Sequence, residues 1–515
     1  MSNKVLVVGI DGADYRVIDR LLEKGKLPNI EQIMKQGFAL DLESSIPPWT
    51  PTAWTTLTTG KNPGKHGIYD FKNHEEDRLV NETDVRAHRI WDYLDKEDKR
   101  SIILNFPVTS PPSEFNGILI PGYLSPEVPD VTTRPEGIIE ELQNEIGEYR
   151  IYANTKSTDK LRAEFERLMK MRKDAMIYLC REYSWDFGMV QFQRTDTVFH
   201  DLPNEEDIES IYSYFDKCLG ELKEEIDPDI IQVVSDHGMG KTGSWDFRIN
   251  SWLKENGYLV TSNEGYSSGW TKPSESSQQS GGVKNLGALM SNIGITPQKV
   301  DRYLSMFRVS NLIKGILPDA WIKSLLESGG EKIDRKQSKA YCPSGPGLGI
   351  YCENEFQDEI KSELSKLRDP DGRSVFEWVQ HGDEIYGEQA ENNPPDLIMM
   401  PTDMDYFVGA TVTSSVFENA RYKYNHKRVG VWMGEGDIVK KISDRKSANI
   451  VDVVPTTLAL LETPIDREID GEPQLEYFAE VSKPPVKSYR RKSKEKMNSH
   501  SETVEDRLEE LGYLE

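Results

Sequence analysis

Short apolar runs alternate with amphipathic segments along the first half of the chain. Runs typical of buried parallel strands cover 4–10, 101–105, 186–191 and 229–235. Between them, apolar residues recur at helical spacing over 16–37, 160–182 and 204–226. Strands that alternate with helices predict an α/β fold: a doubly wound, mainly parallel sheet with helices on both faces.

The second half of the chain is less regular. A Ser/Gly/Gln-rich stretch and the helical patterns after it predict an inserted cap or lid. Strand-like runs return at 339–342, 348–352 and 396–400, and the polar, basic end is typical of a mobile tail. We therefore predict a first part of the core (1–264), a cap or lid (265–336), a second part of the core (337–480) and a basic tail with a short terminal helix (481–515).

Composition places the chain among ordinary globular proteins. Its 515 residues, 37% of them hydrophobic and 29% charged, can bury a large core. The net charge of −24 argues against a broad basic surface for a nucleic-acid polymer or an anionic membrane, whereas it is compatible with metal cations. The oligomeric state stays open at this point.

The cysteines and the apolar stretches bear on location. Four cysteines lack close paired spacing, so neither a zinc knuckle nor a disulfide framework is expected. The longest apolar stretches fall short of the ~20 residues that a membrane-spanning helix needs, and the first residues do not resemble a secretory leader. We therefore expect no transmembrane segment and a cytoplasmic location.

Acidic and histidine side chains follow the predicted strands. Asp11 follows the first strand, and Asp236 and His237 follow the run 229–235, where the next glycines let the chain turn so that both side chains reach one ion. Asp196 and His200 stand four apart, on one side of a helical turn. A solvated pair is the ordinary interpretation of each motif alone, but the carboxyl ends of parallel strands are where functional groups gather.

A nucleophile and a further histidine complete the candidates. Thr50 precedes Pro51 at a predicted helix start, and the amino end of a helix attracts anions such as a phosphoryl group. Its hydroxyl, ionised by a bound cation, could attack phosphorus, although N-capping by Thr50 or Thr52 is the better explanation of this segment taken by itself. His426 lies in a basic, polar loop and would by itself be a surface histidine.

Five motifs in this order strongly resemble the alkaline phosphatase superfamily, and within it the type I phosphodiesterase/nucleotide pyrophosphatase family. They are Gly9-Ile-Asp-Gly12, Thr50 ahead of Asn62-Pro-Gly-Lys-His-Gly-Ile68, Thr195-Asp196 with His200, Ser235-Asp-His-Gly238, and Asn425-His426. The resemblance implies an alkaline phosphatase-like core and two divalent cations, with zinc suited to the mixed N/O ligands and manganese also compatible. One cation would be held by Asp196, His200 and His426, the other by Asp11, Asp236, His237 and the Thr50 oxygen.

The implied activity is metal-dependent hydrolysis of a small phosphorylated substrate, a phosphodiester or nucleotide pyrophosphate, through phosphothreonine at Thr50. The family's Asn pair is absent here, because Tyr69-Asp70-Phe71 occupies that stretch. Asn73 is a possible substitute. A second donor to the phosphate oxygens is therefore unassigned. The alternatives are a phosphomonoesterase, phosphotransferase or mutase of the same superfamily, or a non-catalytic binder of a phosphorylated ligand; the intact ligand set favours an enzyme.

Overall fold

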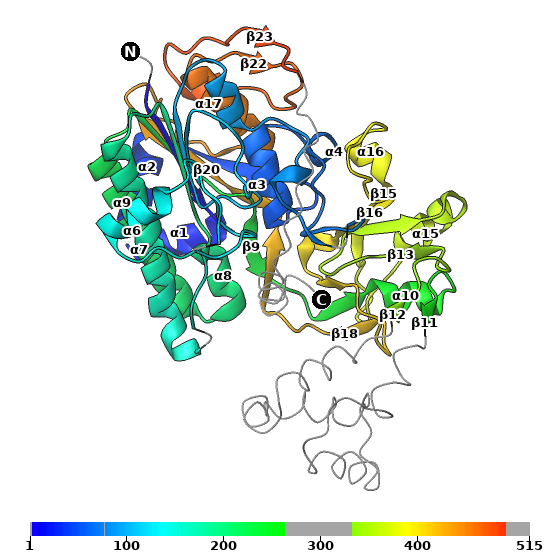
Figure 1. Ribbon diagram of the computed structural model, residues 1–515. Coiled ribbons are helices and arrows are strands. Elements are labelled where there is room, and N and C mark those ends of the chain that lie inside the picture. The colour runs from blue at the N-terminus through cyan, green and yellow to red at the C-terminus, as the bar shows by residue number, and fades with distance from the viewer. Residues whose placement is uncertain (1–2, 77, 129, 156, 263–331, 491–515) are drawn as a thin grey trace, which may run out of the picture.

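The computed structural model describes residues 3–76, 78–128, 130–155, 157–262 and 332–490 (Figure 1). Most of the predicted cap or lid (265–336), and the tail from 491 onward with its predicted terminal helix, lie outside the described residues. Among the described residues no helix is long and apolar enough to cross a membrane. All four cysteines are free thiols. The cytoplasmic location and the exclusion of nucleic-acid partners stay predictions.

An eight-stranded sheet forms the centre of the fold. Its order is β21 (Lys446–Asn449), β2 (Phe38–Glu43), β20 (Val429–Gly436), β8 (Ile230–Val234), β1 (Val5–Ile10), β7 (Phe187–Phe192), β5 (Ser101–Leu104) and β6 (Gly117–Ile120). Strand β20 runs antiparallel to both neighbours, and the other pairings are parallel. Strands β1, β7 and β8 are buried along their whole length, as expected for parallel strands covered on both faces.

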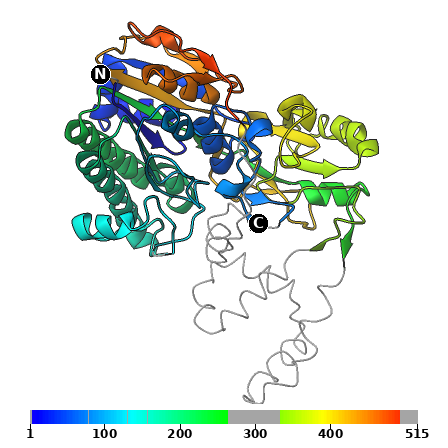
Figure 2. The same ribbon diagram turned by 45° about the horizontal axis from the view of Figure 1, so that its top comes forward.

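Helices cover both faces of this sheet, which confirms the predicted doubly wound fold (Figures 1 and 2). Leu6 and Val8 of β1 pack into one core with helices α1 (Tyr15–Glu23), α2 (Pro28–Gln36), α6 (Ile138–Ile146), α7 (Thr158–Glu182) and α9 (Glu205–Ile226). Val5 and Val7 point the other way, into a core with α3 (Thr50–Thr59), α5 (Ile90–Asp95) and α17 (Val453–Leu460). The alternation along β1 follows from the two-residue period of a strand.

Most predicted elements of the first half are confirmed to within two residues, but the long helix over 16–37 is wrong. The structure has two helices there, α1 and α2. The chain turns between them at Gly25, whose φ is 65°, and Pro28 begins α2. Glycine adopts this left-handed conformation without steric cost and proline suits the first turn of a helix, so both residues favour a break.

A second lobe lies beside the central sheet (Figures 1 and 2). It holds an antiparallel sheet of β13 (Ala340–Tyr341), β14 (Gly349–Cys352), β16 (Leu397–Pro401) and β15 (Phe376–His381), with α15 (Gln357–Leu364) and α16 (Gly382–Tyr386). A smaller sheet joins β17 (Val408–Gly409), β10 (Trp245–Arg248) and β18 (Phe417–Asn419). Helix α10 (Ile249–Glu255) follows β10 in the chain. The predicted second part of the core thus supplies most of this lobe as well as β20 and β21, whereas β10 and α10 come from the predicted first part. The boundaries at 264, 336 and 480 stay predictions.

Shorter elements complete the described part of the chain. Three of them carry or flank candidate site residues: α8 (Arg194–Asp201), β9 (Gly238–Lys241) and β19 (Tyr424–Lys427). The others are α4 (Pro63–His66), β3 (Lys72–Asn73), β4 (Arg78–Leu79), β11 (Thr261–Ser262), β12 (Lys332–Ile333), β22 (Ile465–Asp466) and β23 (Val486–Lys487).

Candidate metal centre and nucleophile

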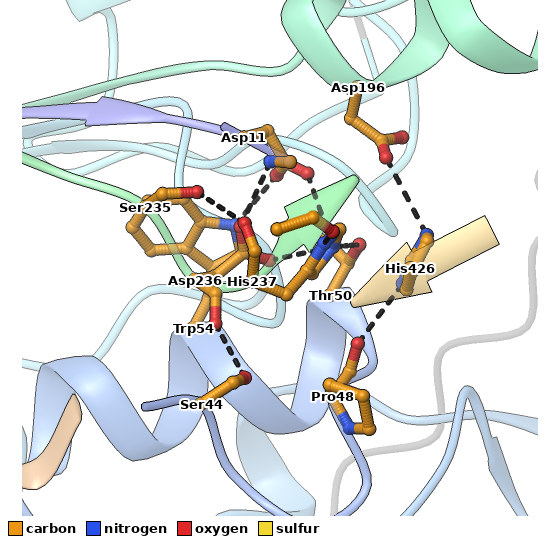
Figure 3. A network of polar contacts seen from close by, with 12 residues as sticks. Asp11, Ser44, Pro48, Thr50, Trp54, Asp196, Ser235, Asp236, His237 and His426 are labelled. Atoms are coloured by element: carbon orange, nitrogen blue, oxygen red, sulfur yellow. Dashed lines mark hydrogen bonds and ion pairs between the residues drawn. The ribbon is translucent and has the colours of Figure 1, made fainter. Parts of the chain in front are cut away.

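The candidate ligands meet at the carboxyl ends of the central strands (Figure 3). Asp11 follows β1 directly, Asp196 lies in α8 just after β7, and Asp236 and His237 connect β8 to β9. Strand β19 pairs antiparallel with β9 and thereby brings His426 to the same place. Parallel strands end at one edge of a sheet, so residues far apart in the sequence become neighbours there.

Two groups of potential ligand atoms form around His237. One ligand atom each from Asp11, Asp236 and His237 lie within 4.8 Å of one another, and the same holds for Asp196, His237 and His426. The Nε2 atom of His237 is 3.3 Å from Asp236 Oδ2 and 3.7 Å from Asp11 Oδ1. His237 therefore stands between the two groups.

His200 lies beside the second group. Its Nε2 atom is 3.5 Å from Asp196 Oδ1, the same distance that separates His426 Nε2 from that oxygen. The four-residue spacing in α8 thus places His200 and Asp196 together, as predicted. All seven candidates, Thr50 included, converge in one place; their roles as ligands stay a proposal.

The two buried histidines are oriented by backbone carbonyls. Nδ1 of His237 lies 3.0 Å from Gly238 O, and Nδ1 of His426 lies 3.0 Å from Pro48 O. A carbonyl only accepts, so each Nδ1 carries the proton, and each Nε2 keeps a lone pair that a cation between the ring and the nearby carboxylates would accept. The rings stack with centroids 3.8 Å apart. This is the arrangement of metal-binding histidines, in which the second ring nitrogen fixes the tautomer.

The expectation that His426 lies in a surface loop is wrong. The residue is in strand β19 and only 3% exposed. Its neighbours in the sequence are polar and basic, but the pairing of β19 with β9 buries the ribbon against the end of the central sheet. A long-range pairing of this kind leaves no local signal.

Each of two carboxylates keeps one oxygen without a hydrogen bond. Oδ2 of Asp11 accepts from the indole N–H of Trp54 at 2.7 Å and from the amide of Gln191 at 2.6 Å, whereas its Oδ1 accepts none. Oδ1 of Asp236 accepts from the Gly12 N–H at 3.3 Å, and its Oδ2 accepts none. Buried carboxylate oxygens are costly without a partner, so these two fit a bound cation.

Burial and charge shift the pKa values in the site. Burial raises the pKa of Asp11 and Asp236, and the neighbouring carboxylates raise it further. Burial also acts to raise the pKa of Asp196, but His200, His426 and His237 outweigh it and hold that pKa well below its usual value. Burial lowers the pKa of His237 and His426, which keeps both neutral and able to bind metal. Clustered buried carboxylates with neutral histidines suit divalent cations.

Thr50 lies in the first turn of α3 with its side chain buried. Its Oγ1 atom is 3.5 Å from His237 Nε2, at the edge of the first ligand group (Figure 3). The N-cap residue of α3 is Trp49, and no side-chain hydrogen bond caps the helix. Neither Thr50 nor Thr52 therefore caps the helix with its hydroxyl, and the Thr50 hydroxyl is available to the candidate metal centre.

Two positioning residues escaped the sequence analysis. Trp54 and Gln191 both donate to Asp11 Oδ2, and the amide of Asn105 donates to Gln191 Oε1 at 2.9 Å. Gln191 carried a signal, because a polar side chain inside a fully buried apolar strand needs a partner. Trp54 stands one helical turn after Thr50, but packing was the simpler interpretation of a buried tryptophan.

Two other residues near the site have structural roles. Nε2 of His66 lies 2.9 Å from the hydroxyl of Thr56, and its Nδ1 accepts from the Ile68 N–H, as expected for a packing element of the chain after α3. The amide of Asn73 donates to the carboxylate of Asp84 at 2.8 Å. Asn73 is thus part of another polar network, and the second donor to phosphate stays unassigned.

A cavity opens beside the second ligand group. His200, His426 and Trp49 line it together with Phe71, Phe407 and Tyr422. We call it the metal-side cavity.

Solved structures share this fold at low sequence identity. The murine ectonucleotide pyrophosphatase/phosphodiesterase 5 matches with a TM-score of 0.52 and 13% identity, over 92% of this chain and 100% of that chain. Phosphonoacetate hydrolase from Sinorhizobium meliloti 1021, in complex with phosphonoformate, gives 0.53 and 13% over 88% and 94%. The wild-type alkaline phosphatase PafA gives 0.55 and 13% over 93% and 99%. No curated protein matches the sequence significantly.

The family model for type I phosphodiesterase/nucleotide pyrophosphatase matches residues 5–315, which include the candidate nucleophile and every candidate ligand except His426. The match covers more than half of the chain. The protein therefore belongs to the type I phosphodiesterase/nucleotide pyrophosphatase family.

Proposed function

We propose that this protein hydrolyses phosphodiesters or nucleotide pyrophosphates through a covalent intermediate on Thr50. Membership of the family supports metal-dependent phosphoester hydrolysis in general. One observation supports the finer proposal most directly: Thr50 Oγ1 lies 3.5 Å from Nε2 of His237, the residue common to both ligand groups. The nucleophile and the candidate cation positions are therefore neighbours.

We assign one cation to Asp196, His200 and His426, and the other to Asp11, Asp236, His237 and the Thr50 oxygen. His237 lies close enough to both groups to orient either. Two divalent cations, zinc by ligand type, would lower the pKa of the Thr50 hydroxyl, neutralise the phosphoryl oxygens and activate water.

The proposed reaction consists of two successive displacements at phosphorus. Thr50 gives its proton to solvent and its Oγ1 attacks phosphorus, forming a new O–P bond while the bond to the leaving oxygen breaks. Because Thr50 lies in the first turn of α3, a phosphoryl group on it would lie near the amino end of that helix, where free N–H groups and the helix dipole favour an anion. Water then attacks the same phosphorus and releases Thr50, so two in-line steps give overall retention.

A rate comparison tests this proposal. Metal-stripped protein is assayed with zinc or manganese restored, on bis(4-nitrophenyl) phosphate and on 4-nitrophenyl phosphate. Faster cleavage of the diester, with a phosphoryl adduct on the Thr50 peptide after acid quenching, is the expected result. Preference for the monoester would favour the phosphomonoesterase or mutase alternative, and absence of turnover on both would favour a binder.

A further inference from the structure

A buried lysine lies at the end of strand β19. Lys427 is only 7% exposed, although lysine is rarely buried without partners for its charge. Its Nζ atom donates to Asp403 O at 2.8 Å, to Met404 O at 3.1 Å and to the Asp405 carboxylate at 2.6 Å. An ammonium group has three N–H donors, so all of them are used within one turn of the second lobe. We call residues 403–406 the lobe turn.

The backbone of the lobe turn needs contacts that hold it. The φ angles of Asp403 and Met404 are 54° and 52°, in the left-handed region that residues with a side chain rarely adopt. Such strain persists only where the surroundings stabilise it. Lys427 bonds to the carbonyls of both residues from the buried side. On the exposed side, Arg373 pairs with the carboxylates of Asp403 and Asp405 at 2.8 Å each.

The residue that precedes His426 holds the same turn. The Asn425 amide donates to Met404 O at 3.2 Å and to Tyr406 O at 3.3 Å. Its own oxygen accepts from the His426 N–H at 2.9 Å. Successive side chains of a strand point to opposite faces, so Asn425 and Lys427 share one face of β19 while His426 points from the other face toward the candidate ligands. Both neighbours of His426 are therefore fixed to the lobe turn.

A glycine of β9 leaves room for the lysine side chain. Gly240 stands opposite Asn425 in the antiparallel pair of β9 and β19. A Cβ atom at Gly240 would lie 2.7 Å from Lys427 Cε and 3.0 Å from its Cγ. The aliphatic stem of Lys427 therefore crosses this glycine on its way to the lobe turn, and a larger residue there would displace it.

His426 connects this anchor to the candidate metal centre. Its Nε2 atom lies 3.5 Å from Asp196 Oδ1, and its Nδ1 lies 3.0 Å from the carbonyl of Pro48, two residues before Thr50 (Figure 3). A metal ligand must be held within a fraction of an ångström of its productive position, and supporting contacts provide this precision. Movement of β19 against the lobe turn would move the His426 ring away from Asp196.

We propose that Lys427, together with Asn425, is a positioning residue that fixes β19 to the lobe turn and holds His426 in place for its cation. The identity of the bound group rests on the proposed function, whereas the anchor is a property of the chain itself. The second lobe would thereby set the affinity of the cation that His426 binds and leave the other cation unaffected.

Zinc binding tests the positioning role. Lys427→Met keeps an unbranched apolar stem and removes the ammonium group, so it should weaken one of the two zinc sites about tenfold and leave the other unchanged. Competition with a chelator measures both affinities. Lys423→Met is the matched control, because Lys423 is exposed on the same segment and donates to Pro203 O instead. Wild-type affinities in Lys427→Met would overturn the inference alone, as would equal weakening of both sites, which indicates a general loss of structure. Absence of zinc binding to the wild type would overturn the inference together with the proposed function.

Hydrogen exchange of the metal-free protein tests the anchor without a cation or turnover. The amides of β19 should exchange about tenfold faster in Lys427→Met than in the wild type. Asp405→Asn keeps the shape of the lobe turn but removes the charge that faces Lys427, so it should act in the same direction even if Lys427→Met does not fold. The double variant should exchange no faster than the faster single variant, because both changes break one contact. Unchanged exchange in the variants, or additive effects, would overturn the inference.

Discussion

The two sides of Trp49 differ in chemistry. The metal-side cavity borders His200 and His426, close to the buried carboxylates of the candidate metal centre. A second cavity, on the other side of Trp49, has aromatic walls that include Tyr386, and Asp70 is the one carboxylate among its described lining residues; we call it the Tyr386 cavity. Under the proposed function, the displacement at phosphorus takes place on the metal side, and the cavity on the other side holds none of the candidate ligands. Variants on the metal side should therefore change turnover or metal binding, and variants on the other side should leave metal binding unchanged.

The largest effect is expected at Thr50. Thr50→Ala removes the proposed nucleophile and should lower kcat by at least about a thousandfold, because the covalent step then lacks the oxygen that attacks phosphorus. Thr52→Ala is the matched control, since this hydroxyl is buried in the same turn without a hydrogen-bond partner. Steady-state turnover of the preferred 4-nitrophenyl ester measures both. Undiminished kcat in Thr50→Ala would remove Thr50 from the mechanism.

The second-largest effect is expected from the loss of one candidate metal ligand. His426→Ala should leave about one bound cation per chain instead of two, because a three-ligand site that loses a histidine binds weakly. Elemental analysis after dialysis measures the occupancy. His74→Ala, on the other side of Trp49, should retain both cations. Full occupancy in His426→Ala would contradict its assignment as a ligand.

A positioning residue should have a smaller effect. Trp54→Phe keeps the aromatic packing but deletes the indole N–H that donates to Asp11 Oδ2, and it should weaken metal affinity about tenfold to a hundredfold. Competition with a metal chelator measures this affinity. Trp91→Phe is the control, because Trp91 is equally buried and its indole contacts Ser113 instead. Equal losses in both variants would indicate a packing effect only.

The smallest effect is expected for the free energy of unfolding, in variants of Tyr69 and Tyr386 on the side of Trp49 away from the candidate ligands. Tyr69→Phe loses the hydrogen bond to Glu391 O and should lower the free energy of unfolding by about 1 kcal/mol. Tyr386→Phe removes a hydroxyl that bonds to nothing in the protein, so the free energy should stay the same or rise slightly. Urea denaturation compares the two variants. An equal loss in Tyr386→Phe would show that its hydroxyl is hydrogen-bonded in the folded protein.

The candidate site was largely predictable because its motifs are local. Asp11 follows an apolar strand, Asp236 and His237 follow another, and Asp196 stands one helical turn before His200. Strand ends are visible in the pattern of apolar residues, and parallel strands bring their carboxyl ends together. His426 was found only through the family resemblance, since its local sequence indicates an exposed loop.

The sequence by itself determined the α/β class, most strands and helices of the first half, the family and the set of candidate ligands. These follow from periodicities and short motifs, which depend on neighbouring residues alone. Tertiary structure decided the burial of His426, the hydrogen bonds of Trp54 and Gln191 to Asp11, and the Tyr386 cavity. Each depends on contacts between segments that are tens to hundreds of positions apart, and the packing of the whole chain sets such contacts, so no local pattern records them.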